Sequence, residues 1–247
     1  FERFRLWGFV SSNQFTCVRP SVQGGFRKKG SLFMANGCFI SLEGGEGCGK
    51  STMLRLLADE LRARTGREVV ASRSPGGTRV AEKIRSVLKT PEPDENLIPE
   101  TELLLFGACH AQMCERLIRP ALLRGALVLS DRFTDSTVVY QGIARGLPVR
   151  LVAQLNAFAC RDLRPHMTIL LDLDPKIGLS RVSSRGGAAE PDRFDSEELA
   201  FHVKVRDGFL NLAKSEPDRF SVIDASADQE TVFRRILEEI HVRLALV

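Results

Sequence analysis

The amino-acid sequence predicts an α/β protein in which a parallel five-stranded sheet is flanked by helices, so that the fold has three layers. Two observations support this prediction. Short apolar runs alternate with longer stretches in which apolar residues recur every three to four positions, as expected for buried parallel strands and amphipathic helices. In addition, a glycine-rich loop at residues 44–49 joins the first apolar run to the first helical stretch.

The apolar runs identify the strands in chain order. Each run is short, consists mainly of aliphatic or aromatic residues and is bounded by polar residues, glycine or proline. The expected strands are Phe39–Leu42, Val69–Ala71, Leu127–Leu129, Thr168–Leu173 and Phe220–Ile223.

The stretches between these runs have helical spacing, as Leu54, Leu57 and Leu61 illustrate in the first of them. Clusters of Pro and Gly separate the stretches, for example at residues 75–77. The expected helices cover about residues 50–64, 78–89, 98–118, 134–144, 148–162, 175–184, 196–214 and 228–243.

Composition and charge exclude several classes of protein. The chain has 247 residues, which fits one α/β domain with a tail, and no apolar run is long enough to span a membrane. Residues 1–33 hold six of the 35 Lys and Arg residues and one of the 31 Asp and Glu residues, which leaves 29 basic and 30 acidic residues in the rest. That balance lacks the positive surplus of a nucleic-acid-binding protein, so we expect neither a nucleic-acid nor a membrane partner.

Residues 1–33 differ from the remainder, because they are basic and rich in aromatic residues without a clear period. We interpret them as an N-terminal extension that is disordered or not native to the protein, with Met34 as the natural start. An organelle transit peptide is the alternative. The six cysteines form no C-x-x-C pair and no metal-binding spacing, which favours free thiols and a cytoplasmic protein.

The glycine-rich loop extends to Lys50 and Ser51 and fits the pattern G-x-x-x-x-G-K-[ST]. Backbone N–H groups of such a loop surround phosphate oxygens, and the N-terminus of the following helix adds positive potential. Lys50 can reach the β- and γ-phosphates, and the Ser51 hydroxyl can bind Mg²⁺. We therefore predict a nucleoside-triphosphate site, with a chance glycine-rich turn as the alternative.

Two further candidates follow expected strands. Asp131 and Arg132 come after the third strand. At that place an Asp can bind Mg²⁺ beside a phosphate loop, and an Arg can bind phosphoryl oxygens. The alternative is that Asp131 caps the following helix and Arg132 lies on the surface. Asp172 ends the fourth strand without an adjoining Arg, and we interpret it as structural. Arg73 comes after the second strand and could hold an acceptor phosphate, unless it belongs to an ordinary turn.

An arginine-rich stretch runs from Arg181 through Arg185 to Arg193 and contains Gly186-Gly187. It lies between two helical patterns, so we expect a lid that closes over the triphosphate, excludes water and neutralises charge. A solvated loop is the alternative.

Taken together, these motifs resemble those of bacterial thymidylate kinases over about residues 38–243. The matching blocks are E-G-G-E-G-C-G-K-S-T at 43–52, P-G-G-T at 75–78, L-L-F at 104–106, D-R-F-T-D-S-T-V-V-Y-Q-G at 131–142 and D-R-F at 192–194, of which the fourth is the most specific. The resemblance implies that residues 34–247 form a kinase domain with a P-loop kinase fold and a lid. It also implies that the protein phosphorylates dTMP to dTDP with ATP and Mg²⁺, for dTTP synthesis, and that it is a homodimer. Another nucleoside monophosphate kinase and an inactive nucleotide-binding paralogue are the alternatives.

The resemblance also implies roles for individual residues. ATP-binding residues are Gly44, Gly45, Glu46, Gly47, Cys48, Gly49, Lys50, Ser51 and Thr52; Mg²⁺ ligands are Ser51 and Asp131; catalytic residues are Lys50, Arg132, Arg185 and Arg193. For dTMP, Glu46 matches the residue that holds the 3′-OH, Arg73 the phosphate ligand and Phe106 the ring that stacks on thymine. Tyr140 matches the ring under the sugar that leaves no room for a 2′-OH, and the other expected dTMP contacts are Arg132, Ser136, Thr137 and Gln141.

Two positions depart from the family pattern. Ser74 stands where bacterial members usually have Glu, and His110 stands where they usually have an Arg that binds the base carbonyl. His110 follows Phe106 by one helical turn, so we expect both to face the same pocket and His110 to bind the base. A His on a packed helix face without ligand contact is the alternative.

Overall fold

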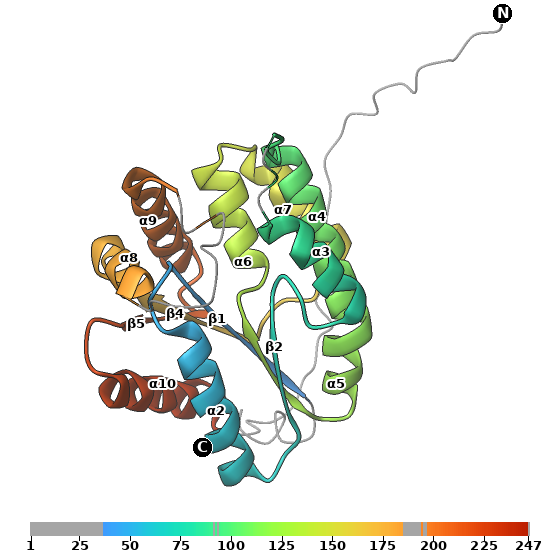
Figure 1. The fold of residues 1–247 in the computed structure, drawn as a ribbon. Helices are drawn as coiled ribbons and strands as arrows, with labels where there is room; N and C mark the ends of the chain where they lie inside the picture. The colour runs from blue at the N-terminus through green and yellow to red at the C-terminus, as the bar shows by residue number, and fades with distance from the viewer. Residues whose placement is uncertain (1–36, 91, 93, 185–193, 195–196, 247) are drawn as a thin grey trace, which may run out of the picture.

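The structure is a computed structural model that describes residues 37–90, 92, 94–184, 194 and 197–246 (Figure 1). Its sheet has five strands, all parallel, in the order β2-β3-β1-β4-β5. The predicted strands are confirmed to within three residues at either end: β1 is Cys38–Gly44, β2 Val69–Arg73, β3 Leu127–Asp131, β4 Met167–Asp172 and β5 Phe220–Asp224.

The helices lie where the sequence predicts them, but two are interrupted. The helices are α2 Lys50–Thr65, α3 Arg79–Lys89, α4 Pro99–Met113, α5 Arg119–Leu123, α6 Thr134–Thr137, α7 Val149–Cys160, α8 Pro175–Ser184, α9 Leu199–Ser215 and α10 Gln229–Leu244. π-Helical segments, Cys114–Ile118 and Val138–Ala144, follow α4 and α6. In the second of them, the N–H of Arg145 donates to the carbonyl oxygen of Tyr140 at 2.9 Å, five residues earlier. Such wide turns occur frequently at functional sites.

The helices cover both faces of the sheet, which confirms the predicted three layers (Figure 1). Helices α2 and α10 contact one face, while α5, α6 and α9 contact the other. Side chains of β1 alternate between these faces. Ile40 and Leu42 belong to the core beneath α2 and α10, whereas Phe39 belongs to the opposite core. No described helix is long and apolar enough to cross a membrane.

The strand register brings the carboxyl ends of β2 and β3 to one level beside β1. Asp131 of β3 pairs with Leu42 of β1 on one side and with Arg73 of β2 on the other. The central strand β1 lies between β3 and β4, which pair with it on opposite sides. A crevice at such a reversal of strand order is the usual ligand site of an open α/β sheet.

Candidate active site

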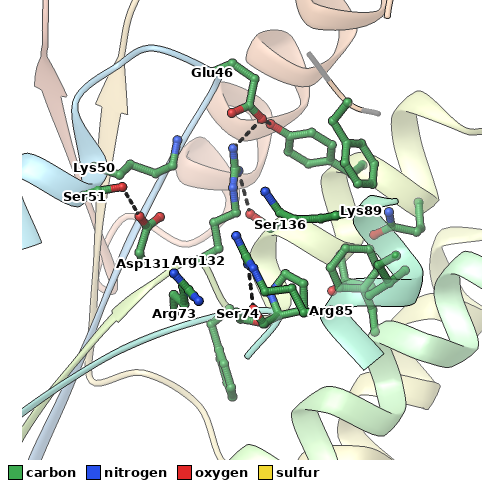
Figure 2. Close-up of a pocket in the computed structure, with 18 of the residues that line it drawn as sticks. Glu46, Lys50, Ser51, Arg73, Ser74, Arg85, Lys89, Asp131, Arg132 and Ser136 are labelled. Atoms are coloured by element: carbon green, nitrogen blue, oxygen red, sulfur yellow. Dashed lines mark hydrogen bonds and ion pairs between the residues drawn. The ribbon is translucent and has the colours of Figure 1, made fainter. Parts of the chain in front are cut away.

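A cavity of about 260 Å³ lies at the carboxyl ends of β2 and β3, beside the loop that follows β1. Its walls come from segments that are distant in sequence: residues 46–52, 73–75, 85–89, 131–141, Phe106 and Phe194. Figure 2 shows side chains from these segments pointing toward a common centre. The strand ends therefore assemble most of the sequence-predicted residues around one space.

The glycine-rich loop folds around the ammonium group of Lys50. Its Nζ donates to the carbonyl oxygens of Gly44 at 3.2 Å and Gly45 at 2.6 Å. Gly47 has φ +68°, and a Cβ there would lie 2.1 Å from the carbonyl oxygen of Gly178 in α8, so that only glycine fits. Gly49, with no side chain to cap α2, leaves the first N–H groups of that helix suited to bind an anion.

Ser51 and Asp131 converge from α2 and β3. Ser51 Oγ donates to Asp131 Oδ2 at 2.7 Å (Figure 2). Hydroxyl and carboxylate oxygens are the ligands that Mg²⁺ prefers, and Mg²⁺ usually takes only one or two protein ligands together with water and substrate phosphates. The pair therefore fits the predicted Mg²⁺ site. In contrast, Asp172 forms a bidentate ion pair with Arg206 at 2.7 and 2.9 Å, which agrees with its structural interpretation.

Arg132 links the phosphate loop to the end of β3. Its φ of +68° lies in the left-handed region, which is uncommon for a residue other than glycine. Nη1 donates to the carbonyl oxygen of Gly44 at 3.0 Å and to Ser136 Oγ at 3.1 Å. Nη2 forms an ion pair with Glu46 at 2.6 Å. The guanidinium is thereby fixed at the centre of the cavity wall.

Glu46 is held in its ionised form by its neighbours. The hydroxyl of Tyr140 donates to Glu46 Oε1 at 2.8 Å, and the Arg132 guanidinium lies 4.9 Å from the centre of the Tyr140 ring. Burial alone would raise the pKa of Glu46, but the charges of Arg132 and Lys50 outweigh it and lower the pKa to about 2. Near pH 7 this carboxylate can accept hydrogen bonds from a ligand but cannot donate one.

Glu43 supports the turn that carries Arg132, although the sequence analysis gave it no role. Its carboxyl group is fully buried in β1, where Oε1 accepts from the N–H of Phe133 at 2.7 Å and Oε2 from Ser136 Oγ at 2.6 Å. Burial raises the pKa of Glu43 to about 8. A glutamate inside an otherwise apolar strand is the sequence signal that could have identified it.

His110 does not lie where its spacing from Phe106 predicts. Phe106 lines the cavity, whereas His110 is fully buried behind the wall, with Nε2 2.8 Å from Ser74 Oγ. The expectation that its ring faces the pocket is wrong, because the rings of Phe106 and Phe133, which line the cavity, pack against it at centroid distances of 6.4 and 5.2 Å. Ser74, which the sequence analysis did not include among the site residues, is the member of this pair on the wall.

Most other predicted residues reach the cavity. Arg73, whose Nη2 pairs with Glu82 at 3.1 Å, lines it together with Thr137 and Gln141. The buried Thr137 Oγ1 has no hydrogen-bond partner within the described part of the chain. The residues of the cavity wall for which the sequence predicted a role are Glu46, Gly47, Gly49, Lys50, Ser51, Thr52, Arg73, Phe106, Asp131, Arg132, Ser136, Thr137, Tyr140 and Gln141. Gly44, Gly45 and Cys48 instead surround the Lys50 ammonium, and Arg185 and Arg193 lie outside the described residues.

Two cations on α3 were not predicted from the sequence. Arg85 and Lys89 line the cavity, and Arg85 Nη1 donates to the carbonyl oxygen of Pro75 at 2.7 Å. Their spacing of four residues places them on one helix face. However, α3 also carries Arg79 and Lys83, so the sequence does not indicate which of its basic residues face the cavity. Phe194 was also missed; its ring centroid lies 5.9 Å from that of Tyr140.

Comparisons with known proteins point to one family. The model of the thymidylate kinase family matches residues 42–236. The thymidylate kinases of Syntrophotalea carbinolica and Pseudomonas putida are 48% and 49% identical to this chain over 201 residues each, covering 80% and 81% of this chain and 92% and 93% of theirs. A crystal structure of the thymidylate kinase from Ehrlichia chaffeensis matches with a TM-score of 0.68 and 31% identity, covering 83% of this chain and 98% of that one.

Proposed function

We propose how the residues of the cavity divide between the two nucleotides, ATP and dTMP, in this chain, which belongs to the thymidylate kinase family. The protein is an enzyme that phosphorylates dTMP to dTDP, with ATP as the phosphate donor. The relatives give no support to another nucleoside monophosphate kinase or to an inactive paralogue. The observation that carries the division is the convergence of Lys50, the Ser51–Asp131 pair and Arg132 beside one cavity.

The donor side is the loop after β1 together with the start of α2. Lys50 exchanges its carbonyl partners in the loop for the β- and γ-phosphates of ATP, and the first N–H groups of α2 bind further phosphate oxygens. Ser51 and Asp131 would hold Mg²⁺, which supplies positive charge to the phosphates when it is bound.

The acceptor side is the opposite part of the wall. Arg73 binds the phosphate of dTMP, Phe106 stacks on thymine and the ionised Glu46 accepts a hydrogen bond from the 3′-OH. The Tyr140 ring lies under the sugar, where Arg132 and Glu46 fix it, and leaves no room for a 2′-OH.

The reaction needs positioning and charge more than acid–base chemistry. A phosphate oxygen of dTMP attacks the γ-phosphorus of ATP in line, forms the new P–O bond and displaces ADP. The attacking oxygen is already anionic, so a strong general base is unnecessary. Arg132 and Lys50 stabilise the charge that spreads over the transferred group, and their fixed positions avoid reorganisation during the step.

The experiment that tests this function is the measurement of kcat/KM for dTMP, dUMP and UMP. One methyl group in an apolar pocket is worth about 1–3 kcal/mol, so dTMP should exceed dUMP by roughly ten- to two-hundredfold. UMP should be a very poor acceptor. Tyr140→Ala should relax the preference for deoxyribose, while Tyr140→Phe, which keeps the ring, should retain it. Equal values for UMP and dUMP in the unmodified enzyme would contradict the role of Tyr140.

We also propose that the enzyme is a homodimer that packs through α4 and α7. These helices contact each other and expose apolar side chains, Leu104 at 60%, Leu151 at 53% and Phe158 at 82%. Exposed apolar groups of this size favour burial against another protein surface. Sedimentation should give twice the mass of one chain, and Phe158→Asp should shift it to one. A monomeric unmodified chain at micromolar concentration would contradict the proposal.

We assign the enzyme to the cytoplasm as a further proposal. The five cysteines in the described part of the chain are free and buried, which fits a reducing compartment.

A further inference from the structure

The two residues that depart from the family pattern contact each other. His110 lies between two rings of the cavity wall, with centroid distances of 6.4 Å to Phe106 and 5.2 Å to Phe133. Its only polar contact among the described residues is Ser74 Oγ, 2.8 Å from Nε2. The backbone N–H of Ser74 donates to the carbonyl oxygen of Asp131 at 2.8 Å, which fixes this hydroxyl at one point of the wall.

The surroundings of His110 determine which ring nitrogen carries the proton. Nδ1 is buried and has no hydrogen-bond partner in the part of the chain that the structure describes. Buried N–H donors without a partner are rarer than acceptors left incompletely paired, so the proton belongs on Nε2. Burial lowers the pKa of His110 to about 4, which keeps the ring neutral near pH 7. Nε2–H therefore donates to Ser74 Oγ.

A hydroxyl oxygen that accepts from His110 must use its own proton elsewhere. We infer that Ser74 donates this proton to the carbonyl oxygen at C4 of the acceptor base, and that His110 fixes the direction of the hydroxyl; this inference rests on the proposed function. Ser74 is only 5% exposed, and that exposure is toward the cavity it lines. Thymine offers carbonyl acceptors along its edge, whereas cytosine has an amino donor in place of one of them.

The pair therefore selects between bases by the polarity of one hydrogen bond. With two lone pairs, Ser74 Oγ could accept from an amino group as well as from His110, but its own proton would then lack an acceptor, since His110 aside no described residue bonds this hydroxyl. To donate to His110 instead, Ser74 would need the ring proton to move to Nδ1. That tautomer buries an N–H without a partner, which is costly. Ser74 is the residue that touches the substrate, and His110 is a positioning residue behind it.

The test compares dTMP with dCMP in matched serine variants. Ser74→Ala should lower kcat/KM for dTMP about three- to tenfold, the usual effect of one neutral hydrogen bond. The kcat/KM for dCMP should not fall, so the ratio of kcat/KM for dTMP to that for dCMP should decrease by a similar factor. Ser221→Ala is the control, because it also removes a buried hydroxyl, which donates to Glu239 at 2.6 Å away from the cavity. It should leave the base preference unchanged.

A second measurement is made on the unmodified chain. ¹⁵N NMR of the unmodified full chain reports the tautomer of each of its four histidines, and the spectrum of His110→Phe identifies the His110 signals. We expect a neutral ring with the proton on Nε2. His110→Phe keeps an aromatic ring but frees the Ser74 hydroxyl, so its preference for dTMP over dCMP should also fall.

An unchanged base preference in Ser74→Ala, or a proton on Nδ1 of His110, would overturn this inference. If the unmodified enzyme failed to phosphorylate dTMP, the proposed function itself would be overturned instead. The two failures are distinguishable, because the first requires an active unmodified enzyme.

Discussion

Individual buried polar atoms determine how Arg132 is presented to the cavity. Glu43 binds the backbone of Phe133 and the side chain of Ser136, and Ser136 in turn contacts Arg132. Arg132 keeps a left-handed backbone conformation that a non-glycine residue adopts at a cost of about 1–2 kcal/mol. The hydrogen bonds from Glu43 help to stabilise this turn, so we expect the charge state of Glu43 to affect the stability of the protein.

Glu43→Gln should remove one source of pH dependence from stability. The folded-state pKa of Glu43 is raised to about 8 from a usual value of 4.5. Between these values the folded state binds more protons than the unfolded state, so this group's contribution to stability is complete below pH 4.5 and is lost as the pH rises through 8. The amide of Gln resembles the protonated acid, because its oxygen can accept from the N–H of Phe133 while its NH₂ group donates to Ser136 Oγ, as the acid proton would.

Urea denaturation of both proteins at several pH values measures this effect. Going from pH 5 to pH 8, the unmodified chain should lose on the order of a few kcal/mol relative to Glu43→Gln. The other titrating groups are the same in both proteins, so their contributions to the free energy of unfolding cancel in this comparison. A constant difference between the two proteins across that range would contradict the assignment.

At the residue scale, the sequence could predict the parts of the site that depend on local pattern. The phosphate loop needs glycines, Lys50 and Ser51 in fixed succession, so its spacing identifies it. Arg85 and His110 depend instead on how far α3 and α4 rotate against the sheet, which no local spacing records. The sequence therefore left Arg85 out and assigned His110 to the pocket surface.

At the scale of elements, the apolar runs predicted the strands well, because the central strands β1, β3 and β4 are buried on both faces. The same pattern could not predict the two π-helical segments, since one additional residue in a turn hardly changes the apolar period. Tyr140 and Gln141, on the cavity wall, lie within the second segment. The wider turn thus determines how these two side chains are presented, although the motif that contains them is evident from sequence.

A buried polar network joins several of these elements. Arg219, just before β5, forms a bidentate pair with Asp135 of α6 at 2.6 and 2.9 Å. The side chains of the pair are 12% and 7% exposed. Thr168 of β4 donates to Asp135 at 3.1 Å and lies 2.9 Å from the hydroxyl of Ser41 in β1. The network therefore fixes α6, which follows Arg132, to the opposite half of the sheet.

Arg219→Ala should be strongly destabilising, because it leaves the buried Asp135 without its charged partner. We expect a loss of about 3 kcal/mol or more in the free energy of unfolding, measured with urea. Arg234→Ala is the control, since Arg234 pairs with Glu238 at 3.7 Å with both side chains more than 60% exposed. Its effect should be below about 1 kcal/mol. Similar values for the two variants would show that the network contributes little.

At the scale of the whole molecule, the sheet, its two helical layers and the cavity walls are built from residues beyond 36. The family model likewise matches residues 42–236. The alternation of strands and helices predicted this architecture, because a parallel sheet with crossover helices is the arrangement that buries every apolar run. The packing of α4 and α7 against a second copy of the chain leaves no comparable periodic pattern in the sequence, so the homodimer remains a prediction.

A chain that begins at Met34 should fold and turn over dTMP like the full chain, since the cores described above consist of residues beyond 36. Thermal unfolding and kcat/KM of both chains measure this. We expect midpoints within a few degrees, which corresponds to less than about 1 kcal/mol for a domain of this size. A large loss of stability or activity on truncation would show that residues 1–33 contribute structure.

The pairing of Asp131 with both Leu42 and Arg73 has a consequence for the separation of the two nucleotides. Adjacent strands are about 4.8 Å apart, so the ends of β1 and β2 are held roughly 10 Å apart by backbone hydrogen bonds before any nucleotide binds. Side-chain substitutions can change affinity without altering that separation. Inserting two residues into β2 would keep Arg73 on its face of the sheet and shift it by about 6.6 Å along the strand, roughly twice the separation of reacting atoms at the moment of attack. Strand insertions, more than substitutions, should therefore yield an enzyme that still binds both nucleotides but no longer transfers phosphate between them.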